Sequence, residues 1–149
     1  MPLSRIKRQL SDHIANAKLD KRVEIIKEVR SNHNVENRKD YYVRTIPSFP
    51  VAGRDLIIAK YDEWNEKDAL IVAVSVEHED YPKFPKVVRA QIIVTAALMK
   101  ENEAGTEVAY TLVSQTDPAG SVPLWMVNKW NTGYIDEMKR LHKEFAKSQ

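Results

Sequence analysis

The chain has 149 residues, 43% of them hydrophobic and 30% charged, which is typical of one globular domain with a substantial core. Its 23 basic and 21 acidic side chains leave a formal net charge of +2, which is too small to indicate nucleic-acid binding. The absence of cysteine excludes disulfides and cysteine-ligated metal sites.

The N-terminal third of the chain predicts one short helix and two strands. Residues 23–30 favour a strand, although Ile26, Val29 and Arg30 also fit a helical stripe. Residues 38–46 are rich in strand-favouring types and follow a turn at 31–34. The helix is predicted from four apolar residues that recur at helical spacing: Leu3, Ile6, Leu10 and Ile14.

A turn rich in proline and glycine then leads into a strand over 54–61, which begins with the adjacent opposite charges of Arg54 and Asp55. Three more strands are predicted over 69–77, 87–99 and 107–116. The loops between these strands, at 62–68, 79–86 and 100–106, are short enough for antiparallel neighbours.

A long amphipathic helix is predicted from about Val122 to Ala146, with Ser121 as its N-cap and Gly133 as a candidate bend. Six strands followed by one long helix indicate an α+β fold in which the helix lies across the sheet. The stripe of apolar residues on this helix either fills an ordinary core or covers an irregular apolar space. Its members are Val122, Trp125, Met126, Trp130, Tyr134, Met138, Leu141 and Phe145.

No stretch carries a recognisable catalytic or metal-binding pattern. Ser75, His78 and Asp80 lie within six residues, but no nucleophile elbow or glycine framing surrounds them. The four histidines lack metal-ligand spacing, and there is no phosphate loop or dinucleotide fingerprint. We therefore expect no catalytic residues, no metal and no cofactor.

The sequence also bears on the location of the protein and on the charge of its N-terminal surface. No apolar run approaches the ~20 residues of a membrane span, and charged residues soon follow Met1 and Pro2. We expect a cytoplasmic protein. Residues 1–30 are basic, which is typical of a solvated helix face and also fits contact with an anionic membrane surface.

Four short motifs in order resemble the START lipid-transfer domain. They are Arg-Asp at 54–55, Ser-Val-x-His at 75–78, Val-Arg-Ala at 88–90, and Asp-Pro-Ala-Gly at 117–120 ahead of Pro123 and Trp125. The resemblance covers roughly residues 19–145. It implies a helix-grip fold of the START/Bet v 1-like type, in which a curved antiparallel sheet wraps a long C-terminal helix around a tunnel for one lipid or sterol.

The resemblance also implies a gate and a departure from the family pattern. The gate is the loop that carries Pro47, Phe49, Pro50 and Gly53, together with the closing helix. The family normally has a further helix and three strands before the part matched here. We therefore expect residues 1–149 to form one START-like domain that lacks those elements: the chain is a fragment, its N-terminal part is replaced, or a partner completes the sheet. A shortened sheet exposes an edge, which favours self-association.

Most of the expected ligand-lining residues follow from the resemblance combined with strand alternation. Lys60 matches a basic tunnel residue of the sterol-carrying branch, the alternative being an exposed lysine at a strand end. For residues 87–99 the inward face cannot be chosen. The lipid-binding set is Tyr41, Val43, Leu56, Ile58, Lys60, Ile71, Ala73, Ser75, Tyr110, Leu112, Ser114, Trp125, Met126 and Trp130.

The leading functional hypothesis is therefore non-catalytic binding of a lipid or sterol and its transfer between membranes. The partners expected are the lipid ligand and a transient membrane surface, with no nucleic acid. A ligand-sensing or interaction module, completed by a partner or by self-association, is the alternative. An enzyme of the wider helix-grip superfamily is the third hypothesis, with Lys60 and Tyr110 as the only suggestion of an acid–base pair.

Overall fold

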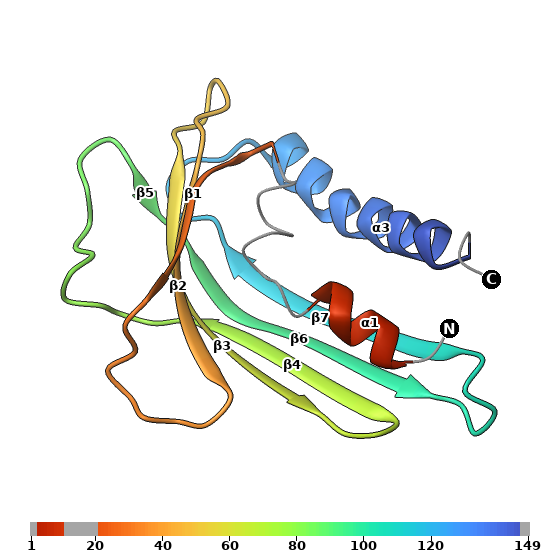
Figure 1. The fold of residues 1–149 in the computed structure, drawn as a ribbon. Coiled ribbons are helices and arrows are strands. Elements are labelled where there is room, and N and C mark those ends of the chain that lie inside the picture. Colours follow the sequence, from red (N-terminus) through yellow and green to blue (C-terminus); the bar gives the residue numbers. More distant parts are fainter. Residues whose placement is uncertain (1–2, 11–20, 147–149) are drawn as a thin grey trace.

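The computed structural model describes residues 3–10 and 21–146, which form one curved sheet with two helices on its concave side (Figure 1). Ile14 and the predicted exit of the first helix fall largely outside the described residues. The elements in chain order are α1 (Leu3–Leu10), β1 (Val23–Val29), β2 (Arg38–Thr45), β3 (Arg54–Trp64), β4 (Asp68–Ser75), β5 (Val88–Arg89), β6 (Gln91–Glu101), β7 (Val108–Asp117) and α3 (Leu124–Ala146).

The sheet has seven strands, and the order of its main path is β1-β2-β3-β4-β6-β7 with antiparallel neighbours throughout. The short β5 pairs in parallel with the first residues of β3. α3 lies across the concave side of the sheet (Figure 1). The predicted helix-grip architecture, a curved antiparallel sheet with a long C-terminal helix, is confirmed. Neither described helix is long and apolar enough to span a membrane.

The prediction of one strand over 87–99 was wrong. The chain first runs beside β3, where the Ala90 amide donates to the Asp55 carbonyl at 3.0 Å, and only then starts β6 beside β4. The predicted loop over 62–68 was also too long. Glu63 and Trp64 pair with Leu70 and Ala69, so the turn between β3 and β4 shrinks to residues 65–67.

The start of α3 differs from the prediction as well. Ser121 is not the N-cap, because the helix begins at Leu124 and the Pro123 carbonyl accepts hydrogen bonds from the amides of Met126 and Val127. Proline suits a helix start, since it has no amide hydrogen to leave unpaired. The helix continues through Gly133 without a break (Figure 1).

Two apolar clusters on the concave face hold these layers together. The first cluster packs Leu3 and Ile6 of α1 against Ala69, Ala97 and Met99 of the sheet. The second lies toward the other end of the sheet and consists of Tyr41, Val43 and Ile58, with partly buried neighbours around them. α1 therefore covers one end of the concave face, and α3 lies beside it on the same side of the sheet (Figure 1).

The convex face carries a smaller aromatic layer, formed where the loop between β4 and β5 folds back over β2. The rings of Tyr42 and Tyr81 stack with centroids 4.6 Å apart, and Phe84 meets Tyr42 edge-on at 6.3 Å. The Lys27 ammonium lies 4.9 Å from the centroid of the Tyr81 ring. These contacts attach the loop to the outside of the sheet.

Candidate functional site

The concave face is built by strict alternation along β3. Successive strand residues point to opposite faces, so Leu56, Ile58 and Lys60 project to the concave side while Asp55 and Ile57 project to the convex side. Strand pairing extends this face sideways, because Ile58 lies opposite Tyr41 on β2 and Ser75 on β4. The predicted lining residues of β2, β3 and β4 thus share one surface.

The predicted lining residues differ in how deeply they are buried. Tyr41, Val43, Ile58 and Met126 are buried, whereas Trp125 is 59% exposed at the start of α3. Trp130 of α3 is half-buried. The other predicted residues of the sheet, apart from Lys60, are also half-buried although both helices lie on this side of the sheet: Leu56, Ile71, Ala73, Ser75, Tyr110, Leu112 and Ser114. Apolar side chains that stay accessible beneath a covering helix leave room for another molecule.

The pairing of β6 resolves its inward face, which the sequence left open. Ala73 lies opposite Thr95, Ile71 opposite Ala97, and Ala69 opposite Met99. Thr95, Ala97 and Met99 therefore face the concave side. An irregularity between Ile92 and Val94 shifts the alternation at the start of this strand. The uniformly apolar sequence around it gives no sign of that shift.

A polar row crosses the concave face between the two apolar clusters. In register, Lys39 lies opposite Lys60, Lys60 opposite Ala73, Ala73 opposite Thr95, and Thr95 opposite Ser114. The hydroxyls of Thr95 and Ser114 are 2.8 Å apart, and the Tyr134 hydroxyl of α3 lies 3.5 Å from that of Ser114. This row brings hydroxyl and ammonium groups onto a largely apolar surface.

Lys60 is the most buried charge of this row, with 9% of its surface exposed. Burial lowers the pKa of its ammonium group, the carboxylate of Asp62 opposes that shift, and Lys39 adds to it. Asp62 in turn accepts a hydrogen bond from the Trp64 indole at 2.8 Å. Asp62 was not predicted as a neighbour of Lys60, because it lies two residues further along the same strand and face and not on an adjacent strand.

The loop between β2 and β3 and the start of α3 lie at the same end of the sheet (Figure 1). Phe49 at the loop tip is 96% exposed, while Val51 is buried and exchanges backbone hydrogen bonds with Ser48. On α3, Leu124 and Trp125 are 74% and 59% exposed. Large exposed apolar side chains from both segments thus gather at one end of the molecule.

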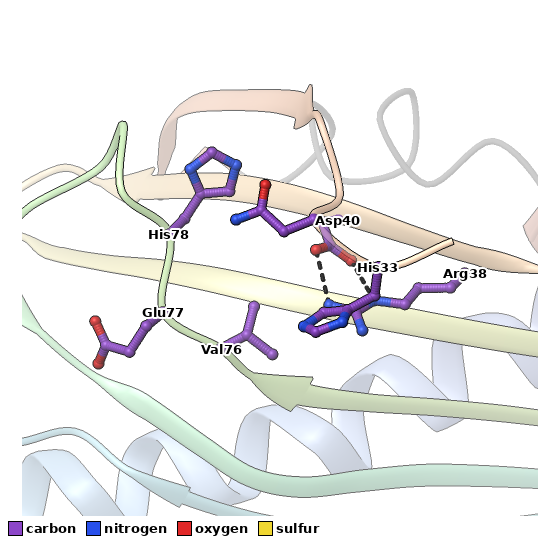
Figure 2. Close-up of a pocket in the computed structure, with 7 residues that line it drawn as sticks. His33, Arg38, Asp40, Val76, Glu77 and His78 are labelled. Atoms are coloured by element: carbon purple, nitrogen blue, oxygen red, sulfur yellow. Dashed lines mark hydrogen bonds and ion pairs between the residues drawn. The ribbon is translucent and has the colours of Figure 1, made fainter. Parts of the chain in front are cut away.

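A polar cleft of about 310 Å³ lies elsewhere, on the convex side, and Figure 2 shows its lining residues. Arg38 and Asp40 form a two-point ion pair there, with distances of 2.8 and 2.9 Å. His78 shares this cleft and contacts the Arg30 carbonyl through Nε2 at 2.8 Å, while its Nδ1 accepts from the Asp80 amide at 3.2 Å. Both ring nitrogens are thus bound to the backbone.

Ser75, His78 and Asp80 therefore do not form a catalytic triad. The Ser75 hydroxyl accepts a hydrogen bond from the Ile92 amide at 2.8 Å, and its side chain is on the concave face. The imidazole of His78 anchors the loop after β4 to the end of β1 instead of activating a nucleophile.

Comparison with known proteins now decides the family. The family model described as "START domain" matches residues 13–149, nearly the whole chain. The chain belongs to the START domain family. START domain-containing protein 10 from mouse and from human are each 32% identical over 108 residues, which cover 72% of this chain and 36% of the relative. The match therefore spans about a third of the length of these relatives.

Solved START structures agree with the fold. The crystal structure of human STARD10 matches with a TM-score of 0.81 and 27% identity, covering 96% of this chain and 58% of that one. Human StAR-related lipid transfer protein 5 matches with a TM-score of 0.63 and 20% identity, covering 86% of this chain and 60% of that one. The START motifs found in the sequence are spread along this fold, and Arg54, Asp55 and Arg89 are among its buried or half-buried residues.

Proposed function

We propose that this START domain binds one lipid or sterol between its concave sheet face and α3, and carries it between membranes. The observation that carries the proposal is the set of apolar side chains on the concave face, among them Ile71, Ala73 and Leu112, that remain half-buried although two helices lie on that side of the sheet. START homologues are lipid-transfer proteins, and one relative of the same fold is named as such. Both points support a carrier.

The energetics of an apolar ligand suit reversible carriage. Each buried CH₂ group gains about 0.8 kcal/mol relative to water, so a dozen of them gain about 10 kcal/mol. A bilayer interior is as apolar as a leucine side chain and offers nearly the same gain. Loading and unloading are therefore close to balanced in free energy, and the rate depends on opening a gate.

The proposed gate consists of the loop 47–53 and the start of α3. Phe49, Leu124 and Trp125 offer exposed apolar side chains to a bilayer. Lys21 and Arg22 lie at the base of this loop, where the Arg22 carbonyl accepts a hydrogen bond from the Ile46 amide. Apolar side chains next to basic ones favour a transient contact with an anionic membrane surface, from which the cytoplasmic and peripheral location follows as part of the proposal.

Lys60 is the proposed anchor for the polar end of the ligand. Its ammonium group is buried at the centre of the concave face and lies between the two apolar clusters. A buried ammonium group is stabilised by an anionic or hydrogen-bond-accepting partner, which a lipid head group or a sterol hydroxyl can supply. The hydroxyls of Thr95, Ser114 and Tyr134 extend this polar row toward α3.

The test compares one tryptophan substitution on each face of the sheet. The protein is incubated with liposomes of mixed natural lipids, re-isolated and extracted for mass spectrometry, and transfer of a labelled lipid is measured in parallel. Ala73→Trp fills the concave side, so we expect it to abolish bound lipid and transfer. Ala96→Trp projects from the convex side of the neighbouring strand and should retain both.

The carrier proposal fails if the folded wild-type protein retains no lipid and does not accelerate transfer. It also fails if the two tryptophan variants lose lipid equally, because the ligand would then not depend on the concave face. Circular dichroism and thermal melts of both variants identify any loss that comes from unfolding.

An open sheet edge favours a second candidate, an interaction module completed by another copy of the chain. β7 ends the strand order, and its ten residues contain no proline, with Asp117 as the only charged residue. Val113 is 57% exposed on this strand, and Leu98 on β6 is 50% exposed, two residues beyond Ala96, which pairs with Val113. Long apolar edge strands readily pair with other strands. Light scattering discriminates the candidates, because a strict monomer that retains lipid excludes self-association.

An enzymatic function has less support. Lys60 lies in the register row of Ser114, whereas Tyr110 lies in the row of Trp64, four residues further along β3. An acid and a base must lie within hydrogen-bond reach of the same substrate atoms, which two separate rows do not favour. We therefore propose a carrier without catalytic residues.

A further inference from the structure

One buried guanidinium group joins the two segments of the proposed gate. Arg54 begins β3 and is 7% exposed. Its Nη1 donates to the Ala52 carbonyl of the loop at 2.6 Å. Its Nε and Nη2 donate to the carbonyls of Pro118 and Ala119, just ahead of α3, at 3.1 and 2.8 Å. Pro118 and Ala119 lie 64 and 65 residues after Arg54 in the chain, whereas Ala52 lies two residues before it.

The backbone around Arg54 fixes this geometry. The Arg54 amide donates to the Thr45 hydroxyl at 3.0 Å, which holds the strand start against the end of β2. The Val88 amide donates to the Gly53 carbonyl at 3.0 Å, and the Val88 side chain lies beside Gly120. A Cβ atom at Gly120 would lie 3.5 Å from Arg54 Nη2, and the φ of Gly120 is +63°. The guanidinium group thus fills a closely packed junction.

We propose that Arg54 is the positioning residue that couples the loop 47–53 to residues 118–124, so that the two segments loosen together. This inference deepens the proposed carrier function, since it concerns the regulation of the same gate. A planar guanidinium group presents several donors in a fixed fork and can bind carbonyls on two segments at once. A lysine ammonium in the same place is a single point donor and cannot reproduce that span.

The loop and the start of α3 are coupled because both bind the same guanidinium group of Arg54. If the loop moves away, Arg54 loses the Ala52 carbonyl and its remaining bonds must hold a charge that has become more exposed to water. If the start of α3 moves away, the same guanidinium loses two carbonyl partners and the loop loses its support. Hydrogen bonds to a charged donor are stronger than neutral ones, so the loss of one set weakens the junction as a whole.

The experiment measures backbone mobility in the ligand-free protein by ¹⁵N relaxation. In Arg54→Met we expect the order parameters of Ala52 and Gly53 and of residues 119–122 to fall together, from about 0.85 toward 0.6 or below. Arg54→Lys should give a smaller fall in the same two segments. Arg44→Met is the matched control, because Arg44 lies one residue before the end of β2, on the convex face, 5.8 Å from the Phe84 ring.

A second variant tests coupling directly. Val51→Ala loosens the loop from within, since Val51 is 5% exposed and bonded to Ser48. With Arg54 present, the change should raise mobility at residues 119–122 as well as in the loop. In the double variant Val51→Ala with Arg54→Met, the loop substitution should have no further effect on residues 119–122.

Two results would overturn the proposal. In the first, Arg54→Met loosens one segment and leaves the other unchanged. In the second, Val51→Ala does not change mobility at residues 119–122, or it raises their mobility by the same amount when Arg54 is absent. If Arg54→Met does not fold, Arg54→Lys replaces it in both tests, alone and combined with Val51→Ala. Because no lipid is present, a failed transfer assay and a failed coupling test are separate outcomes.

Discussion

The carboxylate of Asp55 and the guanidinium group of Arg89 form a two-point ion pair on the convex face, at 2.7 and 3.0 Å. The side chains are 1% and 8% exposed. Arg89 also donates to the carbonyls of Tyr81 and Pro82, so the pair fixes the loop that precedes β5. The hydrogen bonds that Arg89 donates to Asp55 raise the pKa of Arg89, while burial of its guanidinium group lowers it. The neighbouring Arg54 acts on the concave side, so adjacent residues hold loops on both faces.

The first prediction concerns this ion pair. Asp55→Ala should lower the free energy of unfolding by about 3–5 kcal/mol, because it leaves a buried guanidinium group without its counter-charge. Urea denaturation measures the change. Glu28→Ala removes a carboxylate from the pair with Lys39, which is long at 3.9 Å and solvent-exposed. That control should change stability by less than about 1 kcal/mol. Equal losses in the two variants would contradict the prediction.

The second prediction compares two glycines. A Cβ atom at Gly53 would lie 2.7 Å from the Thr45 carbonyl oxygen, whereas a Cβ atom at Gly133 would have no neighbour within 4 Å. Gly53→Ala should therefore destabilise the protein by about 1–3 kcal/mol through overpacking. Gly133→Ala should stabilise it by about 0.5–1 kcal/mol, since alanine is favoured within a helix. Thermal melts that shift in the same direction for both variants would refute this account.

Local patterns predicted most of the sheet. Alternation and turn residues placed β1, β2, β4 and β7 to within a few residues, because each of these strands ends in a loop rich in polar residues. The break at Ala90 was missed. It depends on an ion pair between Arg89 and Asp55, which are 34 residues apart, and no local pattern records such a contact.

The candidate site was predicted less completely than the fold. Alternation along β3 correctly grouped Leu56, Ile58 and Lys60 on one face. Thr95 and Tyr134 were absent from the predicted set, since their place in the polar row depends on an irregularity in β6 and on where α3 lies. A one-residue shift in strand register moves each side chain to the other face of the sheet, and the apolar sequence of β6 does not indicate which register it adopts.

The third prediction concerns membrane contact. Phe49→Ser should reduce binding to anionic vesicles and slow lipid transfer by on the order of tenfold, because it removes an exposed aromatic ring that would enter the bilayer. It should leave stability unchanged, since Phe49 is 96% exposed. The matched control is Val35→Ser, at 51% exposure in the loop between β1 and β2, at the other end of these strands. Sedimentation with vesicles measures binding, and equal losses for both variants would remove the loop from the proposed membrane surface.

The fourth prediction uses the lowered pKa of Lys60, which burial brings below the ordinary value of 10.5. Between the folded pKa and 10.5 the unfolded chain binds more protons than the folded one, so stability rises with pH in that interval. Below the folded pKa, Lys60 is charged in both the folded and the unfolded chain, so folding carries the full desolvation cost of its ammonium group. Lys60→Met removes that cost, so at pH 7 the variant should be the more stable protein.

The advantage of Lys60→Met over the wild type should shrink as the pH rises from neutral toward 10.5, where the wild-type lysine no longer has to be buried as a cation. Urea denaturation of both proteins at several pH values measures the difference. Lys100→Met is the control, because Lys100 is exposed on the other face of the sheet, and it should change stability by less than about 0.5 kcal/mol. A constant advantage at every pH would mean that Lys60→Met acts through packing alone. A variant less stable at pH 7 would mean that the ammonium group has a compensating partner, and the lipid head group would then not be needed to stabilise it.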